Sequence, residues 1–292
     1  MLFTLILCAL LATQSVYSAD IPKAATYVKA TRTGYHYLLV PPLERDSTRA
    51  PNDSLVPLIV SLHGKSLSGS NIRDVTKYGT MYAINDGLKL PAYVIAPQCP
   101  MGQGWNPDRI MSIVDDVCAN YPIDTNRIYV LGMSMGGYGT FDFVGTYPDK
   151  VAAAIAICGG GKQQMASNLC KVPLWVIHGT SDVDVPISQS RVMVSAIKSK
   201  SSKNLHFTEL PRIGHSPLAQ SYNHPKLYDW LLQHDKSDRK VGEACMVPPP
   251  EYKSSEFTWL SKGYSKKKSK RSKYAKRNRK GKKGKAYKRR RR

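Results

Sequence analysis

The sequence predicts an α/β domain built on a mostly parallel, doubly wound sheet. The chain has 292 residues, of which 42% are hydrophobic, and this is enough for one sizeable core. Six short apolar runs, rich in β-branched residues and bounded by Gly or Pro, have the composition of buried parallel strands. Segments with apolar residues at helical spacing lie between these runs, and this alternation is typical of sheets with helices on both faces.

The predicted strands and helices follow one another along the chain. The expected strands are VPLIVSL (56–62), PAYVIAP (91–97), RIYVLG (127–132), VAAAIAI (151–157), PLWVIHG (173–179) and LHFTEL (205–210). The expected helices are 108–120, 138–147, 188–200 and 225–234. Ligands of such sheets bind at the carboxyl ends of the strands, so we expect the functional residues in the loops that follow them.

The N-terminus has the pattern of a signal peptide. An apolar run of about ten residues precedes the small-residue stretch that ends at Ser18, which fits cleavage before Ala19. The run is too short to span a bilayer as a helix, although an uncleaved anchor remains an alternative. We therefore expect residues 1–18 to be removed, no stable membrane span, and a secreted or periplasmic protein.

The C-terminus is strongly basic. Residues 262–292 contain 19 Lys or Arg and no Asp or Glu, and so hold 19 of the net +22 charges. Such a segment has little to bury and is expected to be disordered when free. Three consecutive prolines within 241–261 indicate a semi-rigid linker before it. The catalytic domain is therefore expected to span 19–240.

The stretch LGMSMGGYGTF contains the first candidate catalytic residue. Gly132-Met133-Ser134-Met135-Gly136 has the form G-x-S-x-G, placed where a strand ends and a helix begins, which is the context that this motif requires. The sharp turn forces the serine backbone into a strained conformation, so small residues are needed two positions before and after it. Ser134 is therefore the predicted nucleophile, although a glycine-rich turn with an incidental serine would have the same sequence.

Two later strands end on the partners that such a serine needs. A serine hydroxyl is a weak nucleophile, so it requires a histidine base and an acid that orients the histidine. WVIHGTSDVDVP places Asp182 and Asp184 after one strand, and ELPRIGHSP places His215 after the next. Asp182 is the predicted acid because it comes first after its strand, with Asp184 as the alternative. His215 is the predicted base.

An oxyanion hole completes the expected site. One donor should be the N–H of Met135, directly after the nucleophile. The other should come from the loop SLHGKS after an early strand, where Lys65 N–H is preferred because Gly64 allows the backbone to approach. Both donors belong to the main chain, so their side chains are not constrained by this role.

Several motifs in order make the chain similar to a known family. PQCP (97–100), Trp105, DTNRIYVLGMSMGGYGTF, AAAIAICGGG, PLWVIHGTSDVDVP and TELPRIGHSPLAQSYNHPKLYDWLL together resemble secreted esterases described as predicted peptidases or phospholipase/carboxylesterase-like hydrolases. The resemblance covers roughly residues 30–234. The chain departs from the family's pattern in the oxyanion loop, HGKSLSGSN, and in the Ser-Pro-Leu that follows His215.

The resemblance implies an α/β-hydrolase fold with a triad of Ser134, Asp182 and His215. Relatives include feruloyl and acetyl esterases that act on plant cell-wall polysaccharide, which implies small-molecule or polysaccharide-linked ester substrates. By the same resemblance Trp105 is expected to line the substrate cleft, with core packing as the alternative.

The cysteines fit an exported protein. We expect disulfides Cys99–Cys118 and Cys158–Cys170, each closing a local loop, with Cys245 left over. Spacing alone does not fix the connectivity, and buried reduced thiols are the alternative. No C-x-x-C pair or H-E-x-x-H helix is present in the sequence, so neither a zinc site nor a cofactor is expected.

Two classes of function fit these observations. The first is a secreted serine hydrolase that cleaves carboxylic esters, with a small serine peptidase as a variant of the same chemistry. The second is a polyanion-binding matrix protein on a hydrolase scaffold, because the basic tail suits acidic polysaccharide, lipopolysaccharide or anionic lipid. Nucleic acid is a less favoured partner, since no folded nucleic-acid-binding motif accompanies the tail. The presence of all three triad residues favours the hydrolase.

Overall fold

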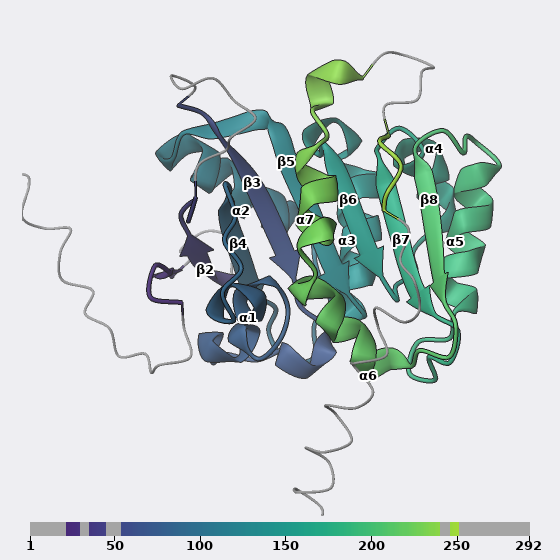
Figure 1. The fold of residues 1–292 in the computed structure, drawn as a ribbon, viewed down its shortest axis with the longest axis horizontal. Coiled ribbons are helices and arrows are strands. Elements are labelled where there is room, and N and C mark those ends of the chain that lie inside the picture. The colour runs from purple at the N-terminus through teal and green to yellow at the C-terminus, as the bar shows by residue number, and fades with distance from the viewer. Residues whose placement is uncertain (1–21, 30–34, 45–53, 240–245, 251–292) are drawn as a thin grey trace, which may run out of the picture.

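One eight-stranded sheet forms the centre of this computed structural model, which describes residues 22–29, 35–44, 54–239 and 246–250. The strand order is β1-β2-β4-β3-β5-β6-β7-β8 (Figure 1). β2 pairs antiparallel with β1 and β4, and every other neighbouring pair is parallel. The chain therefore has the predicted α/β-hydrolase fold. The predicted signal peptide and polybasic tail lie outside the described residues.

All six predicted strands are present. The strands are β1 Thr26–Val28, β2 His36–Val40, β3 Val56–Leu62, β4 Tyr93–Gln98, β5 Ile123–Met133, β6 Ala153–Ile157, β7 Leu174–Gly179 and β8 Leu205–Leu210. β3 and β8 have the predicted bounds, whereas β5 begins four residues before the predicted 127. The antiparallel strands β1 and β2 were not predicted.

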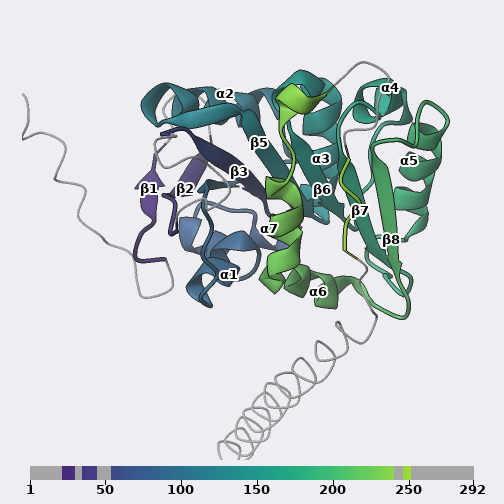
Figure 2. The ribbon, with the colours of Figure 1, turned by 45° about the horizontal axis from the view of Figure 1, so that its top comes forward.

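The helices lie on both faces of the sheet. They are α1 Thr80–Asn85, α2 Pro107–Asn120, α3 Met135–Thr146, α4 Ala166–Leu169, α5 Ser188–Lys198, α6 His215–Leu218 and α7 Pro225–Leu232. α2, α3, α4 and α5 pack in one buried cluster, and α1 and α7 pack in the other. Figures 1 and 2 show α7 crossing the sheet on the face opposite α3.

The strand side chains divide between these two clusters by alternation. On β3, Leu58 and Val60 belong to the cluster that contains α3, and Ile59 belongs to the cluster that contains α7. Successive side chains of a strand point to opposite faces, so a strand covered on both sides must be apolar at every position. This explains why the central strands are continuous apolar runs.

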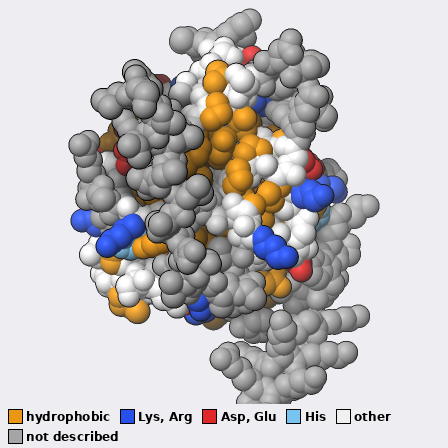
Figure 3. Space-filling model, turned by 90° about the vertical axis from the view of Figure 1, so that its left-hand side faces the viewer, with side chains coloured by type: hydrophobic (Ala, Val, Ile, Leu, Met, Phe, Trp, Pro, Cys, Tyr) orange, Lys and Arg blue, Asp and Glu red, His pale blue; other side chains and the backbone are white. Residues whose placement is uncertain are grey.

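One side of the sheet ends in a short edge. β1 has only three residues, and its side chains are exposed or half-buried. The side of the molecule that bears β1 and β2 shows a band of hydrophobic side chains with Lys and Arg around it (Figure 3). A short edge strand offers few free backbone groups for pairing with another chain.

The segment 246–250, within the predicted linker, contacts the folded domain near α7. Trp230 Nε1 donates a hydrogen bond of 2.7 Å to the Val247 carbonyl, and the Val247 N–H donates to His234 Nε2 at 3.1 Å. Met246 packs against the hydrophobic cluster that contains α7. The chain thus contacts the folded domain again beyond residue 240, where the sequence predicted the domain to end.

Candidate active site

Ser134 is the single residue between the end of β5 and the start of α3. Its backbone has φ 58° and ψ −121°, a conformation that L-residues rarely adopt. It occupies the N-cap position, yet its side chain makes no capping hydrogen bond. The hydroxyl is therefore not committed to helix α3, and the strained backbone holds it at the carboxyl edge of the sheet.

The flanking glycines are required by close backbone contacts. A Cβ on Gly132 would lie 2.2 Å from the Gly136 carbonyl oxygen, and a Cβ on Gly136 would lie 2.0 Å from the Leu62 carbonyl oxygen. Real Cβ atoms do not approach other atoms this closely. The contact at Gly132 is the one predicted from the motif. The contact at Gly136 is with β3, so the second glycine also lets α3 pack against the neighbouring strand.

Asp182 and His215 form a close pair. His215 Nδ1 lies 2.7 Å from Asp182 Oδ2. The other carboxylate oxygen, Oδ1, accepts hydrogen bonds from the N–H groups of Asp184 and Val185 at 3.0 and 2.9 Å. The Asp182 side chain is fully buried, and the His215 side chain is 16% exposed. Both carboxylate oxygens are thus engaged, and the histidine ring is fixed with its other nitrogen available.

Asp184, the alternative acid, is placed differently. It is exposed and lines the cleft, while its backbone N–H supports Asp182. His178, buried beneath the same turn, bonds to Ser190 Oγ at 2.7 Å and to the Val185 carbonyl at 2.9 Å. Burial lowers the pKa of His178. It therefore lies in the core below the turn.

An open cleft of about 1320 Å³ brings the predicted residues together. Ser134 and His215 both line it, as do Lys65 and Met135. The rest of its wall includes Ser66, Lys77, Tyr78, Tyr82, Asp86, Met133, Tyr138, Asp184, Val185, Ser216, Ala219, Gln220 and Asn223. The predicted nucleophile, a histidine paired with a carboxylate, and the two predicted oxyanion donors therefore open on one cavity.

The two predicted oxyanion donors are the first residues of helical turns. Met135 begins α3, and Lys65 begins a 3₁₀ turn that ends at Leu67. The first N–H groups of a helix have no acceptor within it. A Cβ on Gly64 would lie 3.3 Å from Ser134 Cβ, so the glycine lets this loop pass directly beside Ser134.

Tyr78 supports that loop and was not identified from the sequence. Its hydroxyl accepts a hydrogen bond of 3.0 Å from the Gly64 N–H and lies 3.2 Å from Ser66 Oγ. Burial raises the pKa of Tyr78, so the phenol stays neutral at ordinary pH. Since Tyr78 lies 14 residues from Gly64 in an irregular segment, no local motif marks it.

His63 and Trp105 support the same loop from the core. His63 Nε2 accepts from the Cys99 N–H at 2.9 Å, which leaves Nδ1–H to donate to the Gly64 carbonyl at 2.8 Å. Burial lowers the pKa of His63 to about 4, consistent with this neutral form. Trp105 Nε1 donates to the His63 carbonyl at 3.0 Å.

Trp105 occupies a packing position. It is only 7% exposed, belongs to the hydrophobic core and is not among the described residues that line the cleft. A Cβ on Gly139 of α3 would lie 2.7 Å from the indole ring, so that glycine makes room for it. The structure therefore places Trp105 in the core, the alternative role, with an indirect contact to the oxyanion loop through His63.

The predicted disulfides are absent. Cys99, Cys118, Cys158 and Cys170 are all unpaired, and Cys245 lies outside the described residues. Cys99 follows β4 and Cys158 follows β6, at the carboxyl edge of the sheet, whereas Cys118 lies in the last turn of α2 and Cys170 lies between α4 and β7, at the opposite edge. A strand of five or six residues separates the edges by roughly 17–20 Å, far beyond the ~7 Å limit between bridged Cα atoms.

Among the described residues, no helix is both long enough and apolar enough to cross a bilayer. This observation does not extend to residues 1–21, where the apolar N-terminal run lies.

Part of the chain is similar in sequence to known esterases. Residues 107–226 match the family described as Phospholipase/Carboxylesterase. A bifunctional acetylxylan esterase/xylanase of Neocallimastix patriciarum is 33% identical over 144 residues, covering 47% of this chain and 20% of the relative. Feruloyl esterase B of Piromyces equi is 30% identical over 149 residues, covering 44% and 27%. The match therefore spans well under a third of these curated relatives.

A solved structure extends the similarity to most of the described fold. A thermostable esterase superimposes with a TM-score of 0.61 at 29% identity, covering 72% of this chain and 62% of its own. The chain thus has the α/β-hydrolase fold and is similar to known esterases, and its residues 107–226 match the family described as Phospholipase/Carboxylesterase.

Proposed function

We propose that this protein is a serine hydrolase that cleaves carboxylic esters through an acyl-enzyme on Ser134. The observation that carries the proposal is that a serine on a strained turn and a histidine whose Nδ1 lies 2.7 Å from the buried Asp182 carboxylate open on the same cleft. The family match and the esterase relatives support the same reaction class.

His215 is the general base of the proposed first step. Its Nδ1 faces Asp182, so Nε2 is the nitrogen left to accept the Ser134 proton. Ser134 Oγ then attacks the ester carbonyl, and the carbonyl oxygen becomes an oxyanion. When the tetrahedral intermediate collapses, the C–O bond to the alcohol breaks and His215 returns the proton to the departing alcohol.

Deacylation repeats these steps with water as the nucleophile. His215 removes a proton from the water, which attacks the acyl carbon, and the proton passes to Ser134 Oγ as the acyl group leaves as a carboxylic acid. In both halves the oxyanion is expected to accept hydrogen bonds from the N–H groups of Met135 and Lys65. Donors held before the reaction starts stabilise developing charge without reorganising, and each is worth about 2.7–4 kcal/mol in other enzymes.

The proposed substrates are acyl groups linked to polysaccharide. The relatives are an acetylxylan esterase and a feruloyl esterase. The cleft is wide, and Tyr78, Tyr82 and Tyr138 in its wall present aromatic surface to a sugar or phenolic ring. A long carbohydrate chain can lie across an open cleft, with only its acyl group at Ser134.

A substrate panel on the purified protein tests this assignment. Acetylated xylan, a feruloylated arabinoxylan fragment, a long-chain acyl ester and a dipeptide amide would be compared by kcat/KM. We expect the two polysaccharide-linked esters to be cleaved fastest. Preferential cleavage of the dipeptide would favour the peptidase alternative, and no cleavage of any member would favour the matrix-protein alternative.

Tyr78→Phe should lower kcat by about tenfold, with little change in KM. The substitution removes the hydroxyl that holds the Gly64 N–H and Ser66, so the Lys65 N–H loses part of its fixed orientation. Displacing an oxyanion donor should lower kcat by less than the roughly 10²–10³-fold loss in kcat that is measured when a donor is removed. Steady-state kinetics on a small neutral ester measures this effect.

Tyr82→Phe is the matched control for that experiment. Tyr82 is 38% exposed in the same cleft, and the change of side chain is chemically identical. It should alter kcat less than twofold if the effect at Tyr78 comes from the loop. Equal losses for the two variants would contradict the positioning role of Tyr78.

We further propose that the protein is exported and that its basic tail attaches it to polyanionic surfaces. The N-terminal run supports export, and the mature protein should begin at Ala19. The tail supports attachment, since 19 Lys or Arg within 31 residues give it a high charge density. Sequencing the N-terminus of secreted protein tests the first proposal.

Truncation after Leu260 should remove binding to heparin or lipopolysaccharide while leaving ester hydrolysis unchanged. If the tail neutralises six to ten anionic groups, affinity of the full chain should fall by about 10³–10⁵-fold between roughly 50 and 200 mM salt, as for DNA. A tail of equal length with Gln in place of its Lys and Arg is the control. Loss of hydrolysis on truncation, or no binding by the full chain at low salt, would contradict this division of roles.

A further inference from the structure

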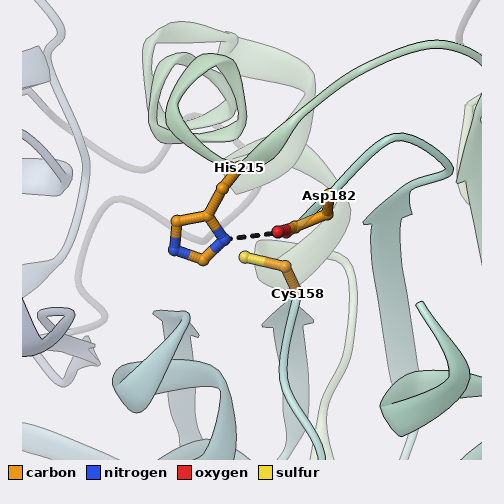
Figure 4. A group of neighbouring side chains, drawn as sticks. All are labelled: Cys158, Asp182 and His215. Atoms are coloured by element: carbon orange, nitrogen blue, oxygen red, sulfur yellow. Dashed lines mark hydrogen bonds and ion pairs between the residues drawn. The ribbon is translucent and has the colours of Figure 1, made fainter. Parts of the chain in front are cut away.

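Cys158 lies beside the catalytic pair and takes no part in the proposed reaction. It follows β6 at the carboxyl edge, has φ 40° and is fully buried. In Figure 4 its sulfur points toward the hydrogen bond between His215 and Asp182. Ligand atoms of Cys158, Asp182 and His215 all lie within 4.8 Å of one another.

These three donors are suited to a soft divalent ion. Thiolate, imidazole and carboxylate are the groups that hold Zn²⁺ in proteins, whereas Mg²⁺ and Ca²⁺ prefer sites made only of oxygen. Bond lengths of about 2.0–2.3 Å place the ligand atoms of a tetrahedral zinc site roughly 3.3–3.6 Å apart. The distances between the ligand atoms therefore need to change by at most about 1.2 Å, which small rotations of the side chains provide.

We propose that Cys158, Asp182 and His215 form an inhibitory site for Zn²⁺ and for softer ions such as Cd²⁺. The ion enters from the cleft, where His215 is 16% exposed, and water from the cleft fills its fourth position. Coordination forms an S–metal bond and releases the thiol proton to solvent; when the ion binds His215 at Nδ1, the proton of that nitrogen moves to Nε2, so the ring stays neutral. The ion takes ligand atoms of both His215 and Asp182, so the histidine can no longer act as base for Ser134.

The buried thiol gives this site its selectivity. A thiolate binds Zn²⁺ and Cd²⁺ strongly, whereas Mg²⁺ and Ca²⁺ prefer oxygen ligands and gain little from a sulfur ligand. Cys158 is fully buried beside Asp182 and His215, so its sulfur is held at the site.

The test is titration of the full chain with Zn²⁺, Cd²⁺ and Mg²⁺. Zn²⁺ and Cd²⁺ should inhibit hydrolysis of a small ester reversibly, with activity restored by a chelator, and Mg²⁺ should not. Cd²⁺ should also produce a thiolate-to-metal absorption band in the ultraviolet. This band needs no hydrolase activity, so failure of the metal site and failure of the proposed function are distinguishable.

Cys158→Ala should keep ester hydrolysis but raise the inhibition constants for Zn²⁺ and Cd²⁺ by about 100-fold or more, since losing even an indirect support of a metal ligand costs 10–100-fold. Cys158→Ser is a second variant of nearly the same shape, should the alanine destabilise the turn. Cys118→Ser is the matched control, because that thiol is half-buried on α2 and outside the cluster. Wild-type protein insensitive to both ions, or Cys158 variants inhibited as strongly as wild type, would overturn the proposal.

Discussion

Ser134→Ala should lower kcat/KM for a small ester by about four orders of magnitude or more while leaving the fold intact. The variant keeps the cleft and the backbone donors but has no oxygen to form the acyl-enzyme. Triad residues act as a unit, so losing the nucleophile removes nearly the whole contribution of the triad. Steady-state kinetics combined with thermal unfolding separates this loss from a loss of folded protein.

Ser216→Ala is the control for the nucleophile. Ser216 is exposed in the same cleft, next to His215, and has no role in the proposed reaction. Its removal should change kcat/KM less than threefold, within the small effects typical of surface substitutions. If Ser134→Ala retained a tenth of the wild-type activity, the acyl group would have to be held elsewhere, and the assignment of Ser134 would be wrong.

Asp182→Asn should lower kcat by roughly 10⁴-fold, as loss of the same orientation does in a serine protease. The asparagine oxygen can still accept the N–H groups of Asp184 and Val185, which directs its NH₂ group toward His215 Nδ1. That nitrogen must then become an acceptor, so the proton moves to Nε2 and the histidine can no longer deprotonate Ser134. Kinetics on the purified variant measures this loss.

Asp184→Asn tests whether Asp184, the alternative acid, has the role assigned to Asp182. Asp184 supports Asp182 only through its backbone N–H, which the substitution retains. Its side chain is exposed in the cleft, so we expect a change of less than about tenfold, the scale of a surface electrostatic contact. A larger loss for Asp184→Asn than for Asp182→Asn would transfer the role of the acid to Asp184.

The parallel strands could be predicted because a strand that is buried on both faces has a continuous run of apolar residues in the sequence. β3 is apolar at nearly every position, and its bounds match the predicted 56–62. The sequence pattern of β1 and β2 is less distinct, since β1 is a three-residue edge strand and only β2 is mostly buried. The pairing of β2 with β4 joins residues about 60 positions apart, and no local pattern specifies such a pairing.

The candidate site could be predicted where the chain itself sets the geometry. The turn at Ser134 needs glycines at fixed distances, and parallel strands place Asp182 and His215 at the same edge as Ser134. Tyr78 was missed because it reaches Gly64 from an irregular segment. The choice between the two roles of Trp105 could not be made from the sequence for a similar reason, since its indole contacts His63 and Gly139 only after the loop and α3 have packed.

The contacts of the cysteines also could not be predicted from local sequence. Closeness in sequence suggested Cys99–Cys118 and Cys158–Cys170, but in each pair the intervening segment crosses from the carboxyl edge of the sheet to the amino edge. Cys158 instead meets Asp182 and His215, which are 24 and 57 positions further along the chain. Metal-ligand spacing rules examine neighbouring residues, so they could not reveal this cluster.

The most direct test of the proposed function is to locate the adduct of a fluorophosphonate probe on the full chain by mass spectrometry. Trypsin should release residues 128–150 as one peptide, because Arg127 and Lys150 flank a stretch without Lys or Arg, and Ser134 is the single serine within it. We predict that wild-type protein gives this peptide with one adduct on Ser134 and that Ser134→Ala gives none. An adduct on a serine outside this peptide, or no labelling of folded wild-type protein, would contradict the proposal that Ser134 is the nucleophile of a serine hydrolase.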